Sequence, residues 1–131
     1  MDEIKQIIKS PRSNIGRRSR TKGHNYEREI TTFFKKLGYV ANTTRKASRL
    51  MDDAKLDIHG IPYNVQCKNV KVPINYHSEL KAIKEKVIEL IPERKDLPIF
   101  IFHKKDRKTL IITNLDEFIK LDAFIKAQSK K

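Results

Sequence analysis

Three polar residues in the segment LDIHGIPYNVQCKN, Leu56 to Asn69, have side chains that can hold a metal ion and a phosphate group: Asp57, Gln66 and Lys68. The segment is typical of two short strands around a tight turn, and side chains alternate across a strand. Pairing the two strands in register would gather a carboxylate, an amide oxygen and an ammonium group on one face. A hard cation such as Mg²⁺ takes one or two carboxylates plus water and substrate phosphate. A lysine beside it can stabilise charge on a scissile phosphate.

The same hairpin has a simpler interpretation. Its apolar face is expected to enter the core and consists of Leu56, Ile58, Val65 and Cys67. The polar face would then be solvated, with Asp57 and Lys68 forming a surface ion pair of little energetic value. Spacing alone does not decide between a metal site and a solvated face.

A predicted helix upstream carries two further acids. It runs from about residue 21 or 25 to residue 37, before Gly38, and places apolar residues on one stripe at helical spacing: Tyr26, Ile30, Phe33, Phe34 and Leu37. Glu27 and Glu29 lie on opposite flanks of this stripe, so either could reach the edge of the core. Glutamates in a first turn also stabilise a helix through its dipole, without any further role.

The remaining elements follow from periodicity and turn residues. We expect a strand at 39–45, a polar loop at 46–53, the hairpin turning at 59–62, a helix at 76–91, a strand at 97–103, a strand at 108–113, and a last helix capped by Asn114. The run LPIFIFH is nearly continuous in apolar residues, which predicts a central strand covered on both faces. The fold class is therefore α/β, an α+β mixed sheet with helices packed on it, in the order α-β-β-β-α-β-β-α.

Charge is the most informative part of the composition. The chain has 131 residues, which suits one domain, and 29 Lys and Arg against 16 Asp and Glu give a net charge of +13. Such an excess attracts polyanions, of which nucleic acid is the usual one. We expect residues 1–20 to be a flexible basic arm and residues 21–131 to be the folded domain. A basic protein without specific affinity, with an ordinary disordered terminus, is the alternative.

The sequence says less about where the protein is located in a cell and about the role of its cysteine. A single cysteine excludes an internal disulfide and a zinc site built from several thiolates. No apolar run approaches the length of a membrane span, and no signal-peptide pattern opens the chain. We expect no membrane association and a cytoplasmic protein, in a host-cell cytoplasm if the source is viral, and not a secreted one.

Three segments together resemble a known enzyme group. They are KGHNYEREITTFFKKLGYVANTTRKASR, KLDIHG and YNVQCKN. In order and spacing they resemble the PD-(D/E)XK nuclease superfamily, and more closely the Holliday-junction resolvases of archaea and phages. Those enzymes have a Lys-Gly, an acid-Arg-acid helix start, a serine-containing loop, an Asp on one strand and an acid-x-Lys on the next. The resemblance covers about residues 22–69 and implies a restriction-endonuclease-like fold.

The resemblance assigns roles to individual residues. Glu27 matches the helix acid, Asp57 the metal-bridging aspartate and Lys68 the motif lysine. Gln66 stands where the family usually has Glu, and the backbone carbonyl of Cys67 commonly completes the metal site. The implied catalytic residues are Glu27, Asp57, Gln66 and Lys68, and the implied metal ligands are Glu27, Asp57, Gln66 and the Cys67 carbonyl.

Gln66 is a departure from the common motif. A QxK variant occurs in other branches of the superfamily, including Mrr-type restriction enzymes and some transposase nuclease subunits. Glutamine keeps an oxygen ligand and removes one negative charge, so metal binding should weaken and depend more on Glu27 and the substrate phosphate. The departure leaves open both the subfamily and a binding protein with a decayed active site.

The expected function is a Mg²⁺-dependent DNA endonuclease, with Mn²⁺ as a substitute, that resolves four-way junctions. Two symmetric cuts need two active sites, so a homodimer is expected, with the last helix as its candidate interface. The residues expected to bind DNA are Arg12, Arg17, Arg18, Arg20, Lys22, Arg45, Lys46, Ser48 and Arg49. The alternatives are an Mrr-like restriction or repair endonuclease on duplex DNA and a catalytically silent DNA-binding module of the same fold.

Overall fold

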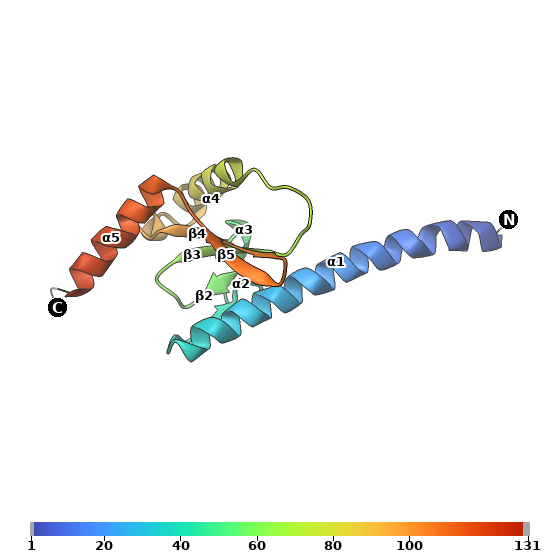
Figure 1. Cartoon of the computed structure of the whole chain (residues 1–131), viewed down its shortest axis with the longest axis horizontal. Coiled ribbons are helices and arrows are strands. Elements are labelled where there is room, and N and C mark those ends of the chain that lie inside the picture. Colours follow the sequence, from blue (N-terminus) through green and yellow to red (C-terminus); the bar gives the residue numbers. More distant parts are fainter. Residues whose placement is uncertain (1, 130–131) are drawn as a thin grey trace.

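A three-stranded mixed sheet lies between two helices (Figure 1). This computed structural model describes the backbone of residues 2–129, and the side chains of residue 18 and residues 20–129. The sheet has the order β3-β4-β5, with bounds Asn64–Lys68, Ile99–Lys105 and Lys108–Ile112. β3 pairs parallel with β4, and β5 pairs antiparallel with β4. The chain is thus of the mixed α/β class.

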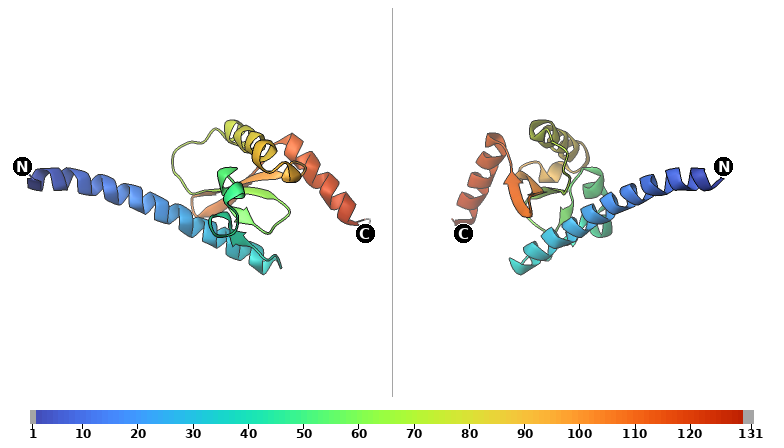
Figure 2. Two further views of the ribbon diagram at one scale, coloured as in Figure 1. Left: turned by 180° about the vertical axis from the view of Figure 1, so that it is seen from behind. Right: turned by 45° about the vertical axis from the view of Figure 1, so that its right-hand side comes forward.

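The central strand β4 is buried on both faces. Ile99 and Ile101 belong to the apolar cluster formed with α4, Tyr76–Leu90. Phe100 and Phe102 belong to the cluster formed with α1, Asp2–Lys36. The two helices accordingly lie on opposite sides of the sheet in both directions of view (Figure 2). This confirms the prediction of a central strand covered on both faces.

Helix α1 is longer than expected. Its backbone is helical from Asp2 to Lys36, and its first half extends beyond the rest of the molecule (Figure 1). From residue 2 on, the expected flexible basic arm of residues 1–20 falls within this helix. Whether the arm acts as a separate unit stays a prediction. Within the predicted apolar stripe, Tyr26, Ile30 and Phe34 are buried, but Phe33 is 44% exposed and Leu37 is 59% exposed. The stripe was predicted too wide, because the sheet covers only its middle.

The other long helices occur where the periodicity predicted them. In α4 the inward residues are Leu80, Ile83 and Val87. Helix α5, Leu115–Ser129, begins after Asn114, whose Oδ1 accepts a hydrogen bond of 2.9 Å from the backbone N–H of Glu117. This confirms the predicted cap.

The predicted strand at 39–45 is wrong in most of its length. Only β1, Asn42–Thr43, is extended and paired, and it pairs antiparallel with β2, Ile58–His59. Two short helices occupy the end of the predicted strand and the expected polar loop: α2 at Thr44–Ala47 and α3 at Arg49–Asp53. A 3₁₀ turn, Pro92–Arg94, precedes β4. The observed order therefore departs from the simple α-β-β-β-α-β-β-α series.

The predicted hairpin between residues 56–58 and 63–68 is also wrong. β2 pairs with β1, and β3 pairs with β4. The physical reason is the intervening turn, whose carbonyls at Ile61 and Tyr63 accept hydrogen bonds of 3.0 and 2.9 Å from Nη2 of Arg94. One backbone hydrogen bond of 2.8 Å, from the N–H of Asp57 to the carbonyl of Val65, still joins the two segments. With the turn held by Arg94, they do not continue as a ladder.

Gly60 is required at this turn. Its φ is +90°, and a Cβ built there would lie 2.1 Å from the carbonyl oxygen of Val40.

We predict that Gly60→Ala lowers the free energy of unfolding by about 2 kcal/mol or more, through backbone strain and overlap. Gly23→Ala is the control, since a Cβ at Gly23 has no atom within 4 Å and should stabilise the helix by up to about 1 kcal/mol. Urea unfolding of the three proteins measures both effects, and equal stabilities would contradict the assignment.

Candidate functional site

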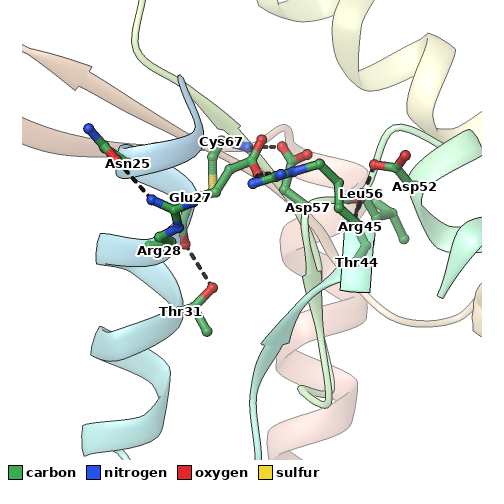
Figure 3. Close-up of polar contacts among 10 residues, drawn as sticks. All are labelled: Asn25, Glu27, Arg28, Thr31, Thr44, Arg45, Asp52, Leu56, Asp57 and Cys67. Atoms are coloured by element: carbon green, nitrogen blue, oxygen red, sulfur yellow. Dashed lines mark hydrogen bonds and ion pairs between the residues drawn. The ribbon is translucent and has the colours of Figure 1, made fainter. Parts of the chain in front are cut away.

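Asp57 is fixed between the two apolar clusters. Leu56 before it is buried in the α4 cluster, and Ile58 after it is buried in the α1 cluster. Its backbone N–H donates to the carbonyl of Val65 at 2.8 Å, and its Oδ2 accepts a 2.7 Å hydrogen bond from the backbone N–H of Cys67. The carboxylate therefore lies against the outer edge of β3. Figure 3 shows this bond beside the neighbouring polar side chains.

A second set of hydrogen bonds holds Asp57 from the other side. The backbone N–H of Thr44 donates to the Asp57 carbonyl at 3.1 Å, and the Thr44 hydroxyl donates to the Leu56 carbonyl at 2.6 Å. Thr44 is fully buried. The start of α2 thus anchors the segment that carries Asp57, which makes the position of the carboxylate a property of the folded core.

The environment of Asp57 disfavours its charge. Part of the residue is accessible to solvent, yet burial of the carboxyl group raises its pKa to about 7. The Cys67 hydrogen bond and Lys68 lower this pKa, whereas the charges of Glu27 and Asp52 raise it. Glu27 and Asp57 therefore lie close enough to repel one another. A cation placed between two such carboxylates would offset both the burial and the repulsion.

Glu27 is the helix acid that reaches this place. Its Oε2 accepts from Nε of Arg45 at 3.1 Å, and Nη2 of Arg45 lies 3.1 Å from the same oxygen. Figure 3 shows Glu27 extending from α1 toward Asp57, with Arg45 alongside. Glu29 lies on the opposite flank, where its Oε2 is 3.3 Å from Nζ of Lys104. Helical spacing alone did not show which of the two acids lies at the site. Their different cationic partners, Arg45 for Glu27 and Lys104 for Glu29, place the two acids on opposite flanks of α1.

Each of the two carboxylates is held by one oxygen. Oε2 of Glu27 bonds to Arg45, and Oδ2 of Asp57 bonds to Cys67. Among the residues whose side chains are described, no donor contacts Oε1 of Glu27 or Oδ1 of Asp57. Two fixed carboxylates each keep one oxygen that a further ligand can engage.

Gln66 is buried, and its single side-chain oxygen has no hydrogen-bond partner among the described residues. Its Nε2 donates to the Lys55 carbonyl at 3.3 Å, whereas its Oε1 is buried with no hydrogen-bond donor among the described residues. A buried polar atom without a partner costs free energy and calls for an explanation. Because Gln66 pairs with Ile101, it lies on the α4 side of β3, opposite Cys67.

The predicted convergence on one face of a hairpin is therefore only partly observed. Val65 and Gln66 lie on opposite faces of β3 as expected, but Leu56 joins the α4 cluster rather than the face of Val65. Asp57 lies against the edge of β3. Nζ of Lys68 lies 3.9 Å from Oε2 of Glu79, with both side chains partly exposed, so this pair is weak. Glu27 and Lys68 both lie close enough to Asp57 to affect its pKa. Among the residues whose side chains are described, no hydrogen bond joins any of these three to the Gln66 side chain.

The described residues contain no group of three or more His, Cys, Asp and Glu side chains arranged to hold a metal ion. The expected ligand set includes only two such residues, Glu27 and Asp57, together with an amide oxygen and a backbone carbonyl. These are hard oxygen donors, the type that Mg²⁺ prefers. The free oxygens of Glu27 and Asp57 match this ion in donor type, as does the buried Oε1 of Gln66 on the α4 side of β3.

The residues expected to bind DNA have mixed surroundings. Arg45 is tied to Glu27, and Ser48 caps α3 by accepting a hydrogen bond of 3.3 Å from the backbone N–H of Met51. The others whose side chains are described are exposed: Arg18, Arg20, Lys22, Lys46 and Arg49. The side chains of Arg12 and Arg17 lie outside those described.

A basic groove lies next to the carboxylates. It has a volume of about 290 Å³ and separates α1 from the segment 42–46, with Arg45 and Lys46 on one wall. Arg28 and Lys35 line the other wall, beside the hydroxyls of Thr31 and Thr32. The sequence-based prediction missed Arg28 and Lys35, although their separation of two helical turns places them on one flank of α1.

Helix α5 presents apolar side chains to solvent. Leu115, Phe118, Ile119 and Ile125 are exposed. Its inner side contacts the core through Leu121 and through Phe124, whose ring centroid lies 6.3 Å from that of Tyr63. The apolar sequence of this helix is thus only partly used within the chain.

Comparison with known proteins gives no match: no model of a protein family, no curated protein and no solved structure is significantly similar to this chain. Across residues 2–129, no helix combines the length and apolarity needed to cross a membrane.

Ser48 offers a test of the local structure near the site. We predict that Ser48→Ala lowers the free energy of unfolding by about 1 kcal/mol, because the N-terminus of α3 loses its cap, and that Ser48→Asp retains most of the stability. Ser78→Ala is the matched control, since Asn75 rather than Ser78 caps α4. Thermal unfolding compares the variants. An unchanged stability in Ser48→Ala would mean that the cap contributes nothing.

Proposed function

We propose that this protein is a metal-dependent endonuclease with a restriction-endonuclease-like fold that hydrolyses phosphodiester bonds in DNA, with four-way junctions as the expected substrate. The observation that carries the proposal is the arrangement of Glu27 and Asp57. Two carboxylates are brought together from α1 and from the residue before β2, and each is held by one oxygen. Among the residues whose side chains are described, no donor contacts the other oxygen of either carboxylate. The groove of Arg28, Lys35, Arg45 and Lys46 alongside supplies a path for a phosphate backbone.

The protein residues have distinct roles in this proposal. Glu27 and Asp57 would hold the metal ion, with Gln66 Oε1 and the Cys67 carbonyl as further oxygen donors. When bound, Mg²⁺ would lower the pKa of an attacking water molecule and neutralise negative charge on the phosphate. Lys68 lies near enough to Asp57 to influence its pKa, and its ammonium group would stabilise the phosphate as negative charge develops. Arg45 positions Glu27 by holding its Oε2.

A silent DNA-binding module is the second candidate, and two observations favour it. The carboxylate of Glu27 already has a cationic partner in Arg45, and Gln66 supplies no negative charge. Both features weaken a metal site relative to one with three free carboxylates. An Mrr-like nuclease acting on ordinary duplex would use the same residues as a junction resolvase. A homodimer through the exposed face of α5 and a cytoplasmic location remain predictions.

Substitution of the carboxylates tests the catalytic proposal. We predict that Asp57→Asn and Lys68→Ala each lower cleavage by about a hundredfold or more, while DNA binding changes by no more than a few fold. Asparagine still offers an oxygen to the Cys67 N–H, so the fold should be retained. Glu27→Gln should also be severe and Glu29→Gln mild, because only Glu27 lies beside Asp57. The assay compares linear, nicked and four-way DNA with Mg²⁺.

The possible results separate the candidates. Cleavage of four-way DNA alone supports a resolvase, and cleavage of linear duplex supports an Mrr-like enzyme. Binding without cleavage of any substrate by the wild-type protein supports the silent module. Full activity in purified Asp57→Asn would remove Asp57 from the site, and a reversed order for Glu27 and Glu29 would mean that the wrong flank of α1 was chosen.

Gln66→Glu tests the amide as a ligand. We predict that this substitution tightens binding of Mg²⁺ and Mn²⁺ to the DNA-free protein by about tenfold, because it adds a negative charge to a sparse set of donors. Gln66→Met is the matched control, since it keeps the volume and removes the oxygen, and it should weaken metal binding. Calorimetric titration measures both. An affinity that is the same in all three proteins would show that Gln66 does not contact the ion.

A further inference from the structure

A second basic groove lies on the other flank of α1. It has two connected parts, of about 440 and 630 Å³, which share Lys22, Asn69 and Lys104 in their walls. Helix α1 forms one wall. The end of β3, the segment that follows it and the turn between β4 and β5 form the other. None of the wall residues outside α1 was among those expected to bind DNA.

The groove is strongly cationic. Its positive side chains are Arg18, Lys22, Lys71, Lys104, Lys105 and Arg107, against the two carboxylates of Glu29 and Asp106. Glu29 is already neutralised by Lys104, at 3.3 Å. Among the residues whose side chains are described, no carboxylate lies within 4.0 Å of any other cation of the groove. Six positive and two negative side chains give the walls of the groove a formal net charge of +4.

The two walls are held in a fixed relation. The hydroxyl of Tyr26 on α1 is hydrogen-bonded to the Thr109 hydroxyl on β5 at 3.0 Å, and Nζ of Lys104 lies 5.8 Å from the centre of the Tyr26 ring. The turn between β4 and β5 has two residues, Asp106 and Arg107, with φ of 51° and 67°. Positive φ at both positions is the geometry of a tight hairpin turn that matches the strand twist. The cations of this turn are thus presented on rigid backbone.

The segment after β3 is held in a similar way. Nε2 of His103 donates to the carbonyl of Val70 at 3.1 Å, so Nδ1 accepts a 2.6 Å hydrogen bond from the Tyr76 hydroxyl. His103 is buried in β4, and Tyr76 begins α4. This network fixes Val70 and with it the neighbouring Lys71 at the edge of the groove.

We propose that this groove binds the phosphate backbone of nucleic acid at a place separate from the Glu27–Asp57 carboxylates. The proposal rests on the proposed function only for the identity of the partner as DNA. A groove with cations spaced along it suits an extended polyanion better than a single small anion. Among the described residues of its walls, Val70 is the one exposed apolar side chain and no aromatic side chain is exposed, which suits backbone contact rather than membrane insertion or base stacking.

The test uses the double variant Lys105→Gln, Arg107→Asn. Asparagine tolerates the positive φ of residue 107, so the turn should be retained. The control is Lys81→Gln, Lys84→Gln, which removes the same charge from exposed positions on α4 outside the groove. Binding to a labelled linear duplex and to a labelled four-way junction is measured by fluorescence anisotropy in EDTA over a range of salt concentrations. Thermal unfolding verifies that each variant is folded.

We expect the groove variant to bind roughly tenfold more weakly near 0.1 M salt and to lower the slope of log K against log salt by about 2, one phosphate per cation removed. The control variant should leave the slope within about 0.5 of the wild-type value. A slope unchanged in a folded groove variant, or lowered equally by the control, would overturn the proposal. Because EDTA prevents cleavage, this result is independent of catalysis. If the wild-type protein binds DNA through the groove but does not cut it, this inference stands and the nuclease proposal fails. If the wild-type protein cuts DNA and the groove variant binds DNA with an unchanged salt slope, the nuclease proposal stands and this inference fails.

Discussion

The parallel pairing of β3 with β4 is the constraint on which the arrangement of the site depends. β4 is buried on both faces, so its alternating residues are divided between the α1 and α4 clusters. The register that pairs Cys67 with Phe102 and Gln66 with Ile101 imposes the same division on β3. Cys67 must then face α1, and Gln66 must be buried on the side of α4. The N–H of Cys67 on the outer edge of β3 has no strand beside it, and the carboxylate of Asp57 takes that place.

Elements with strong periodicity could be predicted from the sequence, and those defined by single tertiary contacts could not. Local patterns along a whole element predicted helix α4 and strand β4, and a local pattern within one turn predicted the Asn114 cap. The hairpin prediction was wrong because alternation in residues 56–68 also fits two strands that pair with different partners. Arg94 holds the intervening turn through carbonyls that lie 33 and 31 positions upstream, and no local pattern in that segment indicates it.

In the candidate site, too, the residue types could be read from the sequence, whereas the contacts that surround them could not. The sequence supplied the identities of Glu27, Asp57 and Lys68, and their proximity agrees with that interpretation. Helical spacing did not separate Glu27 from Glu29, and the family resemblance alone pointed to Glu27. The different surroundings of the two acids depend on two distant cations, Arg45 and Lys104. The burial of the Gln66 side chain on the α4 side was not predictable either, because it depends on the register of β3 with β4. Arg45 adds a competing partner for Glu27, so the site balances two close carboxylates against one guanidinium group.

The connection between β3 and β4 has a consequence for how the molecule reaches its native state. Parallel strands require a crossover, and here the chain passes through α4 and the 3₁₀ turn before the partner strand begins. Closing so large a loop costs entropy before any strand contact compensates for it, whereas β4 and β5 are joined by two residues and can pair locally. Asp57 acquires its hydrogen bond only once β3 is in place. The candidate site therefore depends on the most non-local strand pairing among the described residues, that of β3 with β4. Neither α1 nor the β4–β5 hairpin can form it in isolation.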